Sequence, residues 1–347
     1  MRADDLLIDT IDKLLEEHAT PERIGAAEGG QDSALWSLLE DSGLTLVGVS
    51  EDRGGSGGTL HDYAAIVKAV GRHAAPVPLA DSLTAANTIG GLTDLEVPAG
   101  PLAYAVHRVG APALRIPWGG AAGHVVIITA TIDGSAPAGL AVVSAADLVV
   151  TGRGDNYPGE PWLEIDAAAV AGGVAVDQPL RFVDARASGA LARALQMAGA
   201  CQRVVDLSVQ YVMEREQFGK PIGKFQILQH YLAEMAGEAA AAEAAADNAV
   251  DVIASGAGRL EVTDAVAAAK AYAGRAVGTI NRLALQIHGA IGYTDEHRLQ
   301  YWTRRLWAWR DEYGTESEWA AHLGRSMAAA GGAALWPRLT NWPAPAD

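Results

Sequence analysis

Two short segments of this sequence combine charged, amide and glycine residues at spacings that could hold a phosphate-bearing ligand. Residues 214–226 read EREQFGKPIGKFQ, and residues 286–294 read QIHGAIGYT. Arg215 carries a permanent charge on a planar fork that matches a pyrophosphate. The glycines of the second segment let a ligand approach the backbone closely. Taken alone, Arg215 is better explained as a charge at a helix end and Phe218 as a core residue, so the two segments carry weight only together.

Most general catalytic and binding motifs are absent from the sequence. It has no GxGxxG after a strand, no GxxxxGK[ST], no GxSxG and no HExxH. The glycine cluster at residues 54–58 lacks the lysine and the strand–helix context of a phosphate loop, so we interpret it as a flexible surface loop. His288 and His297 are not three or four residues apart, and no metal site is expected.

Composition limits the class of protein. The 347 residues are 50% apolar and include 26 Lys and Arg against 42 Asp and Glu, a net charge of −16, which argues against nucleic-acid and anionic-membrane binding. The single cysteine, Cys201, excludes an internal disulfide and any cysteine-based metal cluster. No run approaches the ~18 apolar residues of a membrane span, and the first residues carry acids where a signal peptide is basic. We expect a soluble, cytoplasmic protein.

Hydrophobic patterning predicts an α+β chain in which helices precede and follow a small β domain. Residues 1–100 are interpreted as an N-terminal helical domain, 101–184 as a middle β domain, 185–330 as an antiparallel four-helix bundle and 331–347 as a tail. Within the bundle, long apolar periodicities predict helices over 191–212, 225–250, 262–287 and 295–307. Turns are expected at 133–134, 152–155 and 158–159.

The two polar segments together resemble the acyl-CoA dehydrogenase family, flavoproteins that introduce a 2,3 double bond into acyl-CoA thioesters. The family pattern R-x-x-F-G-x-x-[IL]-x-x-[FH]-Q matches residues 215–226, and Q-x-x-G-[GA]-x-G-[YF] matches residues 286–293 at the expected separation. The resemblance is strong over 185–330, moderate over 35–80 and weak across the β domain. It implies the family fold: a helical domain, a β domain and a helical bundle.

The resemblance also implies FAD as the cofactor. In the family these segments reach across a dimer interface to the ADP half of FAD bound mainly by the neighbouring chain. Arg215 would then hold the pyrophosphate, Phe218 would pack beside the adenine or ribose, and Gln226 would hydrogen-bond it. The full set of cofactor-binding residues that the resemblance implies is Arg215, Gln217, Phe218, Gln226, Gln286, Gly289, Ala290 and Thr315.

The family's catalytic base has no clear counterpart in this chain. Most members carry it as the glutamate of a Y-E-G-T segment, and aligning Gly314 and Thr315 puts Tyr313 there, a phenol with a reference pKa of about 10. Glu312 is one residue away and would point elsewhere. The minority position, early in the long helix, falls on residues 189–190, Gly-Ala. The sequence therefore identifies no catalytic base: Tyr313 occupies the usual position, and Glu312 is the nearest carboxylate.

The family's flavin-ring contacts are also poorly matched in the β domain. In place of an aromatic-x-x-[ST]-E stretch and a W-[IV]-[ST] stretch, the chain offers residues 104–108 (YAVHR) and 118–120 (WGG). The residues for a neighbour's flavin site are thus retained better than those for the chain's own site.

This division resembles the short subunits of actinobacterial α2β2 acyl-CoA dehydrogenases that act on bulky, steroid-type thioesters. The partners so implied are an acyl-CoA substrate, a homologous catalytic subunit and an electron-transfer flavoprotein-like acceptor. Alternatives are a homotetrameric dehydrogenase with a displaced carboxylate (Glu312, Asp311 or Glu316), a flavin monooxygenase of the same fold, and a non-enzymatic helical scaffold. The acyl group is not identified by the sequence.

Overall fold

The computed structural model describes residues 3–167, 173–176 and 180–340. The chain divides into two compact units, described in turn. One comprises Arg2–Val70 and Ala75–Ala192, and the other comprises Gly71–Ala74 and the chain from Arg193 onward.

The first unit opens with helices. They are α1 (Asp5–His18), α2 (Pro21–Ala26), α3 (Ser33–Asp41), α4 (Leu60–Arg72), which leaves this unit after Val70, and α5 (Leu79–Leu92). The side chains of Asp4, Thr20 and Asp32 accept backbone N–H groups at the starts of α1, α2 and α3, as N-caps do. Helix α5 is buried almost throughout, and Ser82 exchanges hydrogen bonds with the backbone of Leu102, which begins the first strand.

The glycine-rich segment before α4 is more structured than the flexible loop that the sequence suggests. Glu51–Arg53 forms a turn of 3-10 helix. Arg53 donates to the carbonyls of Gly90 at 2.7 Å and Leu95 at 2.8 Å, which ties the segment to the end of α5. A Cβ at Gly55 would lie 2.1 Å from the carbonyl oxygen of Val49, so only glycine fits there.

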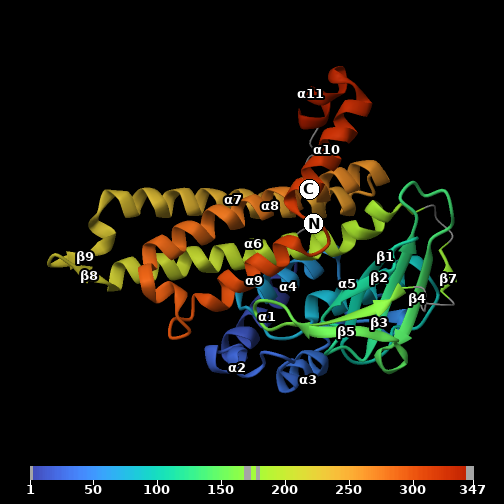
Figure 1. The fold of residues 1–347 in the computed structure, drawn as a ribbon, viewed down its shortest axis with the longest axis horizontal. Coiled ribbons are helices and arrows are strands. Elements are labelled where there is room, and N and C mark those ends of the chain that lie inside the picture. The colour runs from blue at the N-terminus through green and yellow to red at the C-terminus, as the bar shows by residue number, and fades with distance from the viewer. Residues whose placement is uncertain (1–2, 168–172, 177–179, 341–347) are drawn as a thin grey trace. The chain divides into compact units, whose positions relative to one another are not determined.

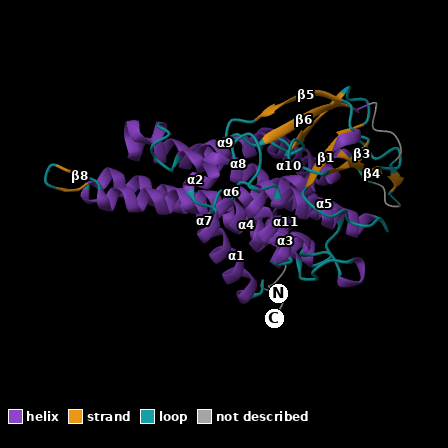
Figure 2. Cartoon of the chain, turned by 90° about the horizontal axis from the view of Figure 1, so that it is seen from below, coloured by secondary structure: helices purple, strands orange, loops and turns teal. Residues whose placement is uncertain are grey.

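The middle of the chain forms two small sheets (Figure 2). The strands are β1 (Leu102–Arg108), β2 (Ala113–Pro117), β3 (His124–Ala130), β4 (Gly139–Ser144), β5 (Val150–Asp155), β6 (Pro161–Asp166) and β7 (Val174–Ala175). One sheet has the order β1-β3-β4-β7, with β1 and β3 parallel, and the other has the order β2-β6-β5. Buried side chains from both sheets form one core, among them Ala103, Ile116, Val125, Ile127 and Ile165.

The turn predicted over residues 152–155 is wrong, because these residues belong to strand β5. The two glycines there lie beside the indole of Trp162 on the neighbouring strand β6. A Cβ at Gly154 would come within 3.0 Å of that ring. The glycines therefore leave space for the tryptophan on the neighbouring strand. The local sequence alone does not distinguish such strand glycines from the glycines of a turn.

The long helices of the second unit run side by side (Figure 1). They are α6 (Phe182–Glu214), which enters this unit at Arg193, α7 (Gln226–Ala254) and α8 (Arg259–His288). Shorter helices follow: α9 (Gln300–Asp311), α10 (Glu316–Ala330) and α11 (Gly332–Thr340). A 3-10 segment, Gly289–Tyr293, follows α8. Buried alanines recur along α7 at Ala239, Ala242, Ala246 and Ala249, and such small side chains allow close helix packing.

The fourth predicted helix is displaced. It begins at Gln300 rather than Asp295, and a further helix, α10, follows a break at residues 312–315. Of the predicted tail, residues 332–340 are helical and 341–347 lie outside the described residues. Among the helices that the structure describes, none combines the length and apolar character needed to cross a membrane.

A substitution at Gly71 can test how closely residues 71–74 pack against the bundle. A Cβ there would lie 2.0 Å from the backbone oxygen of Gln196 on α6, so we expect Gly71→Ala to lower the free energy of unfolding by about 2–3 kcal/mol. On the exposed face of α7, a Cβ added at Gly237 would have nothing within 4 Å, and Gly237→Ala should be neutral or stabilising by up to about 1 kcal/mol. Urea denaturation measures both, and equal effects would contradict the packing argument.

Candidate functional site

The first group of predicted cofactor residues surrounds a hairpin at one end of the bundle. Helix α6 ends at Glu214, and strands β8 (Glu216–Gln217) and β9 (Lys220–Pro221) form a hairpin with a two-residue turn that both views show beyond the helix ends (Figures 1 and 2). Its turn is Phe218-Gly219, with φ of 53° and 77°. Positive φ at both positions is the geometry of a tight hairpin, although it is unusual for a bulky residue such as Phe.

The polar side chains of this group are exposed and unpaired. Within the described part of the chain, no hydrogen bond or ion pair engages the side chains of Arg215, Gln217 or Gln226. The Phe218 side chain is 90% exposed and meets the Phe225 ring edge-on, at 6.2 Å between ring centroids. Phe218 is therefore not the core residue that its type alone would suggest.

The second group follows the end of α8. His288 is the last helical residue, and Gly289 caps the helix with a φ of 63° while its N–H donates to Leu285. Gln286, Gly289 and Ala290 are exposed. Behind them, the buried ring of His288 stacks on Tyr211 of α6, with ring centroids 4.3 Å apart. The structure thus brings the first and second groups to the same end of the bundle.

Thr315 is not part of this end. It caps α10, accepting the N–H of Glu318, and it lies just after Gly314, whose carbonyl accepts from Lys270 in the middle of α8. Residues 270 and 288 are about 27 Å apart along that helix. The predicted cofactor set is therefore split between two places on the bundle.

An anionic dinucleotide fits the exposed end. A free guanidinium suits a pyrophosphate, free amides suit ribose or adenine, and a glycine turn lets the ligand approach the backbone. Because these groups all face outward, a ligand held there would need a second surface to enclose it. Neighbouring apolar side chains are exposed as well: Met213, Phe218, Ile227, Ile291 and Tyr293.

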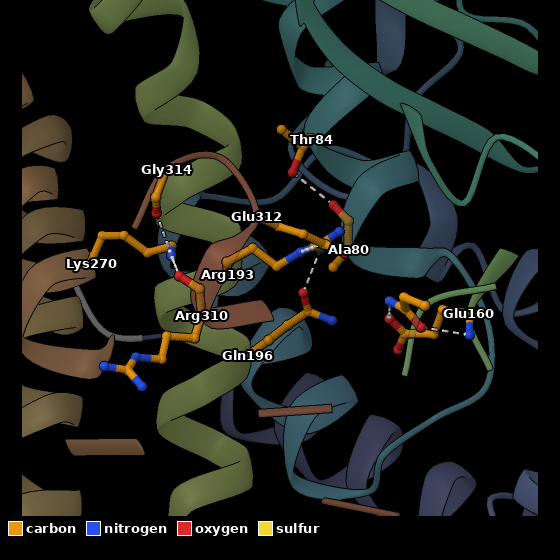
Figure 3. Close-up of polar contacts among 10 residues, drawn as sticks. Ala80, Thr84, Glu160, Arg193, Gln196, Lys270, Arg310, Glu312 and Gly314 are labelled. Atoms are coloured by element: carbon orange, nitrogen blue, oxygen red, sulfur yellow. Dashed lines mark hydrogen bonds and ion pairs between the residues drawn. The ribbon is translucent and has the colours of Figure 1, made fainter. Parts of the chain in front are cut away.

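The turn at the family's base position is held by two buried cations (Figure 3). Arg193 of α6 is fully buried, and its Nε donates to the Glu312 carboxylate at 2.6 Å. Lys270, also fully buried, donates to the carbonyls of Arg310 at 2.7 Å and Gly314 at 2.9 Å. Both contacts fix the turn between α9 and α10.

Tyr313 lies at the centre of this turn. Its φ of 54° and the φ of 103° at Gly314 reverse the chain. The Arg193 guanidinium lies 5.3 Å from the Tyr313 ring centroid, and the indole N–H of Trp319 donates to the Tyr313 carbonyl at 3.0 Å. A tyrosine thus occupies the predicted base position, and its backbone is bonded in place.

The carboxylates beside Tyr313 are either bound to cations or exposed at the end of a helix. Glu312 is bound to Arg193, and Glu316 is bound to Arg310 at 2.6 Å. Asp311 ends α9 and is exposed. At the minority base position, Gly189 and Ala190 are buried and carry no carboxylate.

The poorly matched β-domain residues are turned inward. Tyr104 is buried, its hydroxyl donates to the Ala185 carbonyl at 2.7 Å, and burial raises its pKa. Trp118, with a φ of 57°, is also buried. Neither presents a surface for a flavin ring.

The sequence did not identify the residues that stabilise the turn between α9 and α10, Arg193 and Lys270, or the one that contacts the end of α8, Tyr211. Two of them did carry a signal. Arg193 and Lys270 each stand as a lone cation within a helical run of alanines and other apolar residues, where a charge must be buried with partners. Tyr211 has no such signal.

The Arg193–Glu312 pair should matter more to stability than a surface pair. Glu312→Gln removes the charge opposite a fully buried guanidinium, and we expect it to lower the free energy of unfolding by about 2–3 kcal/mol. The control is Glu316→Gln, whose partner Arg310 is partly exposed and whose loss should cost less than about 1 kcal/mol. Chemical denaturation of both variants measures the difference, and equal costs would refute a special role for the buried pair.

His288 should make the bundle sensitive to acid. Burial lowers the pKa of His288 from 6.5 to about 4, and the nearby His297 adds to the shift. The folded state thus binds the proton more weakly than the unfolded chain, so stability present above pH 6.5 is lost as the pH falls toward 4. Between about pH 7 and pH 5 we expect His288 to account for a loss of about 2 kcal/mol. Urea titrations should show this pH dependence in the wild type and a weaker one in His288→Phe.

Both helical parts of the chain match known proteins of one family. Residues 2–94 match the model of the acyl-CoA dehydrogenase N-terminal domain, and residues 185–326 match that of the C-terminal domain. Acyl-CoA dehydrogenase IpdE2 of Mycolicibacterium smegmatis is 29% identical over 313 residues, which cover 87% of this chain and 91% of the relative.

Solved structures share the fold. A Tcur3481-Tcur3483 steroid ACAD variant has a TM-score of 0.80 at 23% identity, covering 93% of this chain and 97% of the other. The ChsE4-ChsE5 complex of Mycobacterium tuberculosis has a TM-score of 0.71 at 22% identity, covering 93% and 96%. With two family domains matched over more than half of its length, the chain belongs to the acyl-CoA dehydrogenase family of FAD-dependent oxidoreductases.

Proposed function

We propose that this chain is a subunit of an FAD-dependent acyl-CoA dehydrogenase that lacks its own catalytic base and completes the FAD site of a catalytic partner chain. The observation that carries the proposal is the contrast between two places on the bundle. At the base position a tyrosine stands beside a glutamate bound to buried Arg193, whereas at the hairpin end the cofactor-type side chains are exposed and, within the described residues, unpaired.

The residues at the hairpin end have distinct roles in this proposal. Arg215 would hold the pyrophosphate of FAD, and Gln226 would hydrogen-bond the adenosine half. Phe218 would pack on the adenine or ribose. Gln286 and the Gly289–Ala290 turn would bring the backbone close to the dinucleotide. When bound, FAD supplies the acceptor for the hydride that leaves the β-carbon of the acyl-CoA, and the partner chain supplies the base for the α-proton.

The conformation of Phe218 supports a contact outside the chain. A bulky side chain in the left-handed region costs on the order of 1–2 kcal/mol, and at 90% exposure it adds little to this chain's own core. The apolar side chains around it would be covered by the same partner.

The names of two structural neighbours support a partner of related sequence. ChsE4-ChsE5 is described as a complex, and Tcur3481-Tcur3483, which also carries two names, is described as a steroid ACAD. On that basis the substrate is proposed to be a bulky, steroid-type acyl-CoA. The electron acceptor is proposed to be an electron-transfer flavoprotein, and the location the cytoplasm.

The alternative of a self-sufficient homotetramer with Glu312 as base is disfavoured by the structure of the turn. Abstraction of a proton needs a carboxylate that can reach the substrate, and Glu312 is instead bound to Arg193. If Glu312 were the base, the isolated chain would turn over acyl-CoA, and Glu312→Gln would abolish that turnover.

The test is to purify the chain alone and together with the dehydrogenase-like protein that a neighbouring gene encodes. We expect the chain alone to retain little flavin and the complex to be yellow and active. In the complex, Arg215→Ala should weaken FAD binding at least about tenfold, whereas Arg275→Ala, an exposed arginine in the middle of α8, should not. Full flavin content and activity in the isolated chain would overturn the proposal.

A further inference from the structure

The two groups of cofactor-type residues come from different helices, and an aromatic cluster joins them. The cluster consists of Tyr211, His288 and His297. Tyr211 lies one helical turn before Arg215, whose N–H donates to the Tyr211 carbonyl at 2.9 Å. His288 directly precedes Gly289. The cluster therefore connects the segment that carries Arg215 to the turn at Gly289.

The contacts within the cluster define the distances and the angles between its three rings. The Tyr211 and His288 rings are stacked, with an interplanar angle of 26°, and His297 meets them edge-on at 5.9 and 4.8 Å between centroids. The Tyr211 hydroxyl also donates to the His288 carbonyl at 3.4 Å, so it touches the peptide that leads into Gly289. Tyr211 thus contacts His288 through both its ring and its hydroxyl.

His288 is held in one orientation and one tautomer. Its Nδ1–H donates to the Ala284 carbonyl at 2.8 Å, which makes Nε2 the unprotonated nitrogen. That Nε2 is enclosed and has no hydrogen-bond partner among the described residues. An enclosed acceptor without a donor weakens the fold relative to an apolar side chain of similar size. The ring is thus better explained by the geometry that it imposes on the turn than by its contribution to stability.

We propose that Tyr211 is a positioning residue for FAD binding: it sets the Gly289–Ala290 turn relative to Arg215 so that both reach the same dinucleotide. This inference rests on the proposed function. Aromatic stacking gives a defined distance and angle, whereas an aliphatic side chain would fill the same space without fixing either. Arg298 strengthens the arrangement by bonding Gln210 at 2.6 Å, which ties the segment that carries His297 to α6.

The experiment measures FAD affinity and thermal stability separately. The complex of this chain with its catalytic partner is stripped of flavin and titrated with FAD, and the Tm of the flavin-free complex is recorded. The variants are Tyr211→Leu, which removes ring and hydroxyl, and Tyr211→Phe, which removes only the hydroxyl. Tyr272→Leu is the matched control, because Tyr272 lies on α8 with its ring against Arg275, in the helix that also ends at His288.

We expect Tyr211→Leu to raise the Kd for FAD about tenfold and Tyr211→Phe about threefold, while Tyr272→Leu leaves it unchanged. The Tm should fall by similar amounts in the two leucine variants. In an Arg215→Ala background, Tyr211→Leu should cost less than in the wild type, because part of its effect acts through that arginine.

Equal changes in Kd for Tyr211→Leu and Tyr272→Leu would overturn the inference, since they would assign Tyr211 a merely structural role. If Tyr211→Leu does not assemble, an unchanged Kd in Tyr211→Phe overturns it. A Kd that Arg215→Ala itself does not alter would instead refute the proposed function, and the inference with it.

Discussion

Burial of charge is the constraint on which the bundle depends. Arg193 and Lys270 are fully buried, and a buried cation without partners would cost several kcal/mol. Both are satisfied by one short turn, through the Glu312 carboxylate and the carbonyls of Arg310 and Gly314. The ends of α9 and α10 therefore have to meet over α6 and α8 at this one point, and the positive φ angles of the turn are maintained by that requirement.

The bundle also separates the position of the family's catalytic base from the residues of the type that bind the cofactor. At the turn, the acidic side chain is bound to a permanent cation, and the base position holds a tyrosine. At the hairpin end, the guanidinium of Arg215 and the surrounding amides remain free within the described residues. This contrast between the turn and the hairpin end is the basis on which we propose a division of labour between two different subunits.

Alanine-rich helices allow this bundle to place side chains accurately with few large residues. The small buried positions of α7 let the helices approach closely, so the few aromatic groups act as spacers between them. The Tyr211–His288 stack is such a spacer, located where the ends of α6 and α8 approach each other. Because His288 directly precedes the exposed Gly289–Ala290 turn, the packing of Tyr211 against His288 also determines where that turn lies.

The sequence alone determined the order of helices, strands and helices and the family, because periodicity and motif spacing are local properties of the chain. It did not predict β5 correctly, since the glycines of that strand serve Trp162 on another strand, and it missed α10, which begins after a turn fixed by distant cations. Nor could it show that Glu312 is paired or that Phe218 is exposed. Those facts depend on which side chains meet across helices that lie far apart in the sequence, and only the tertiary structure decides that.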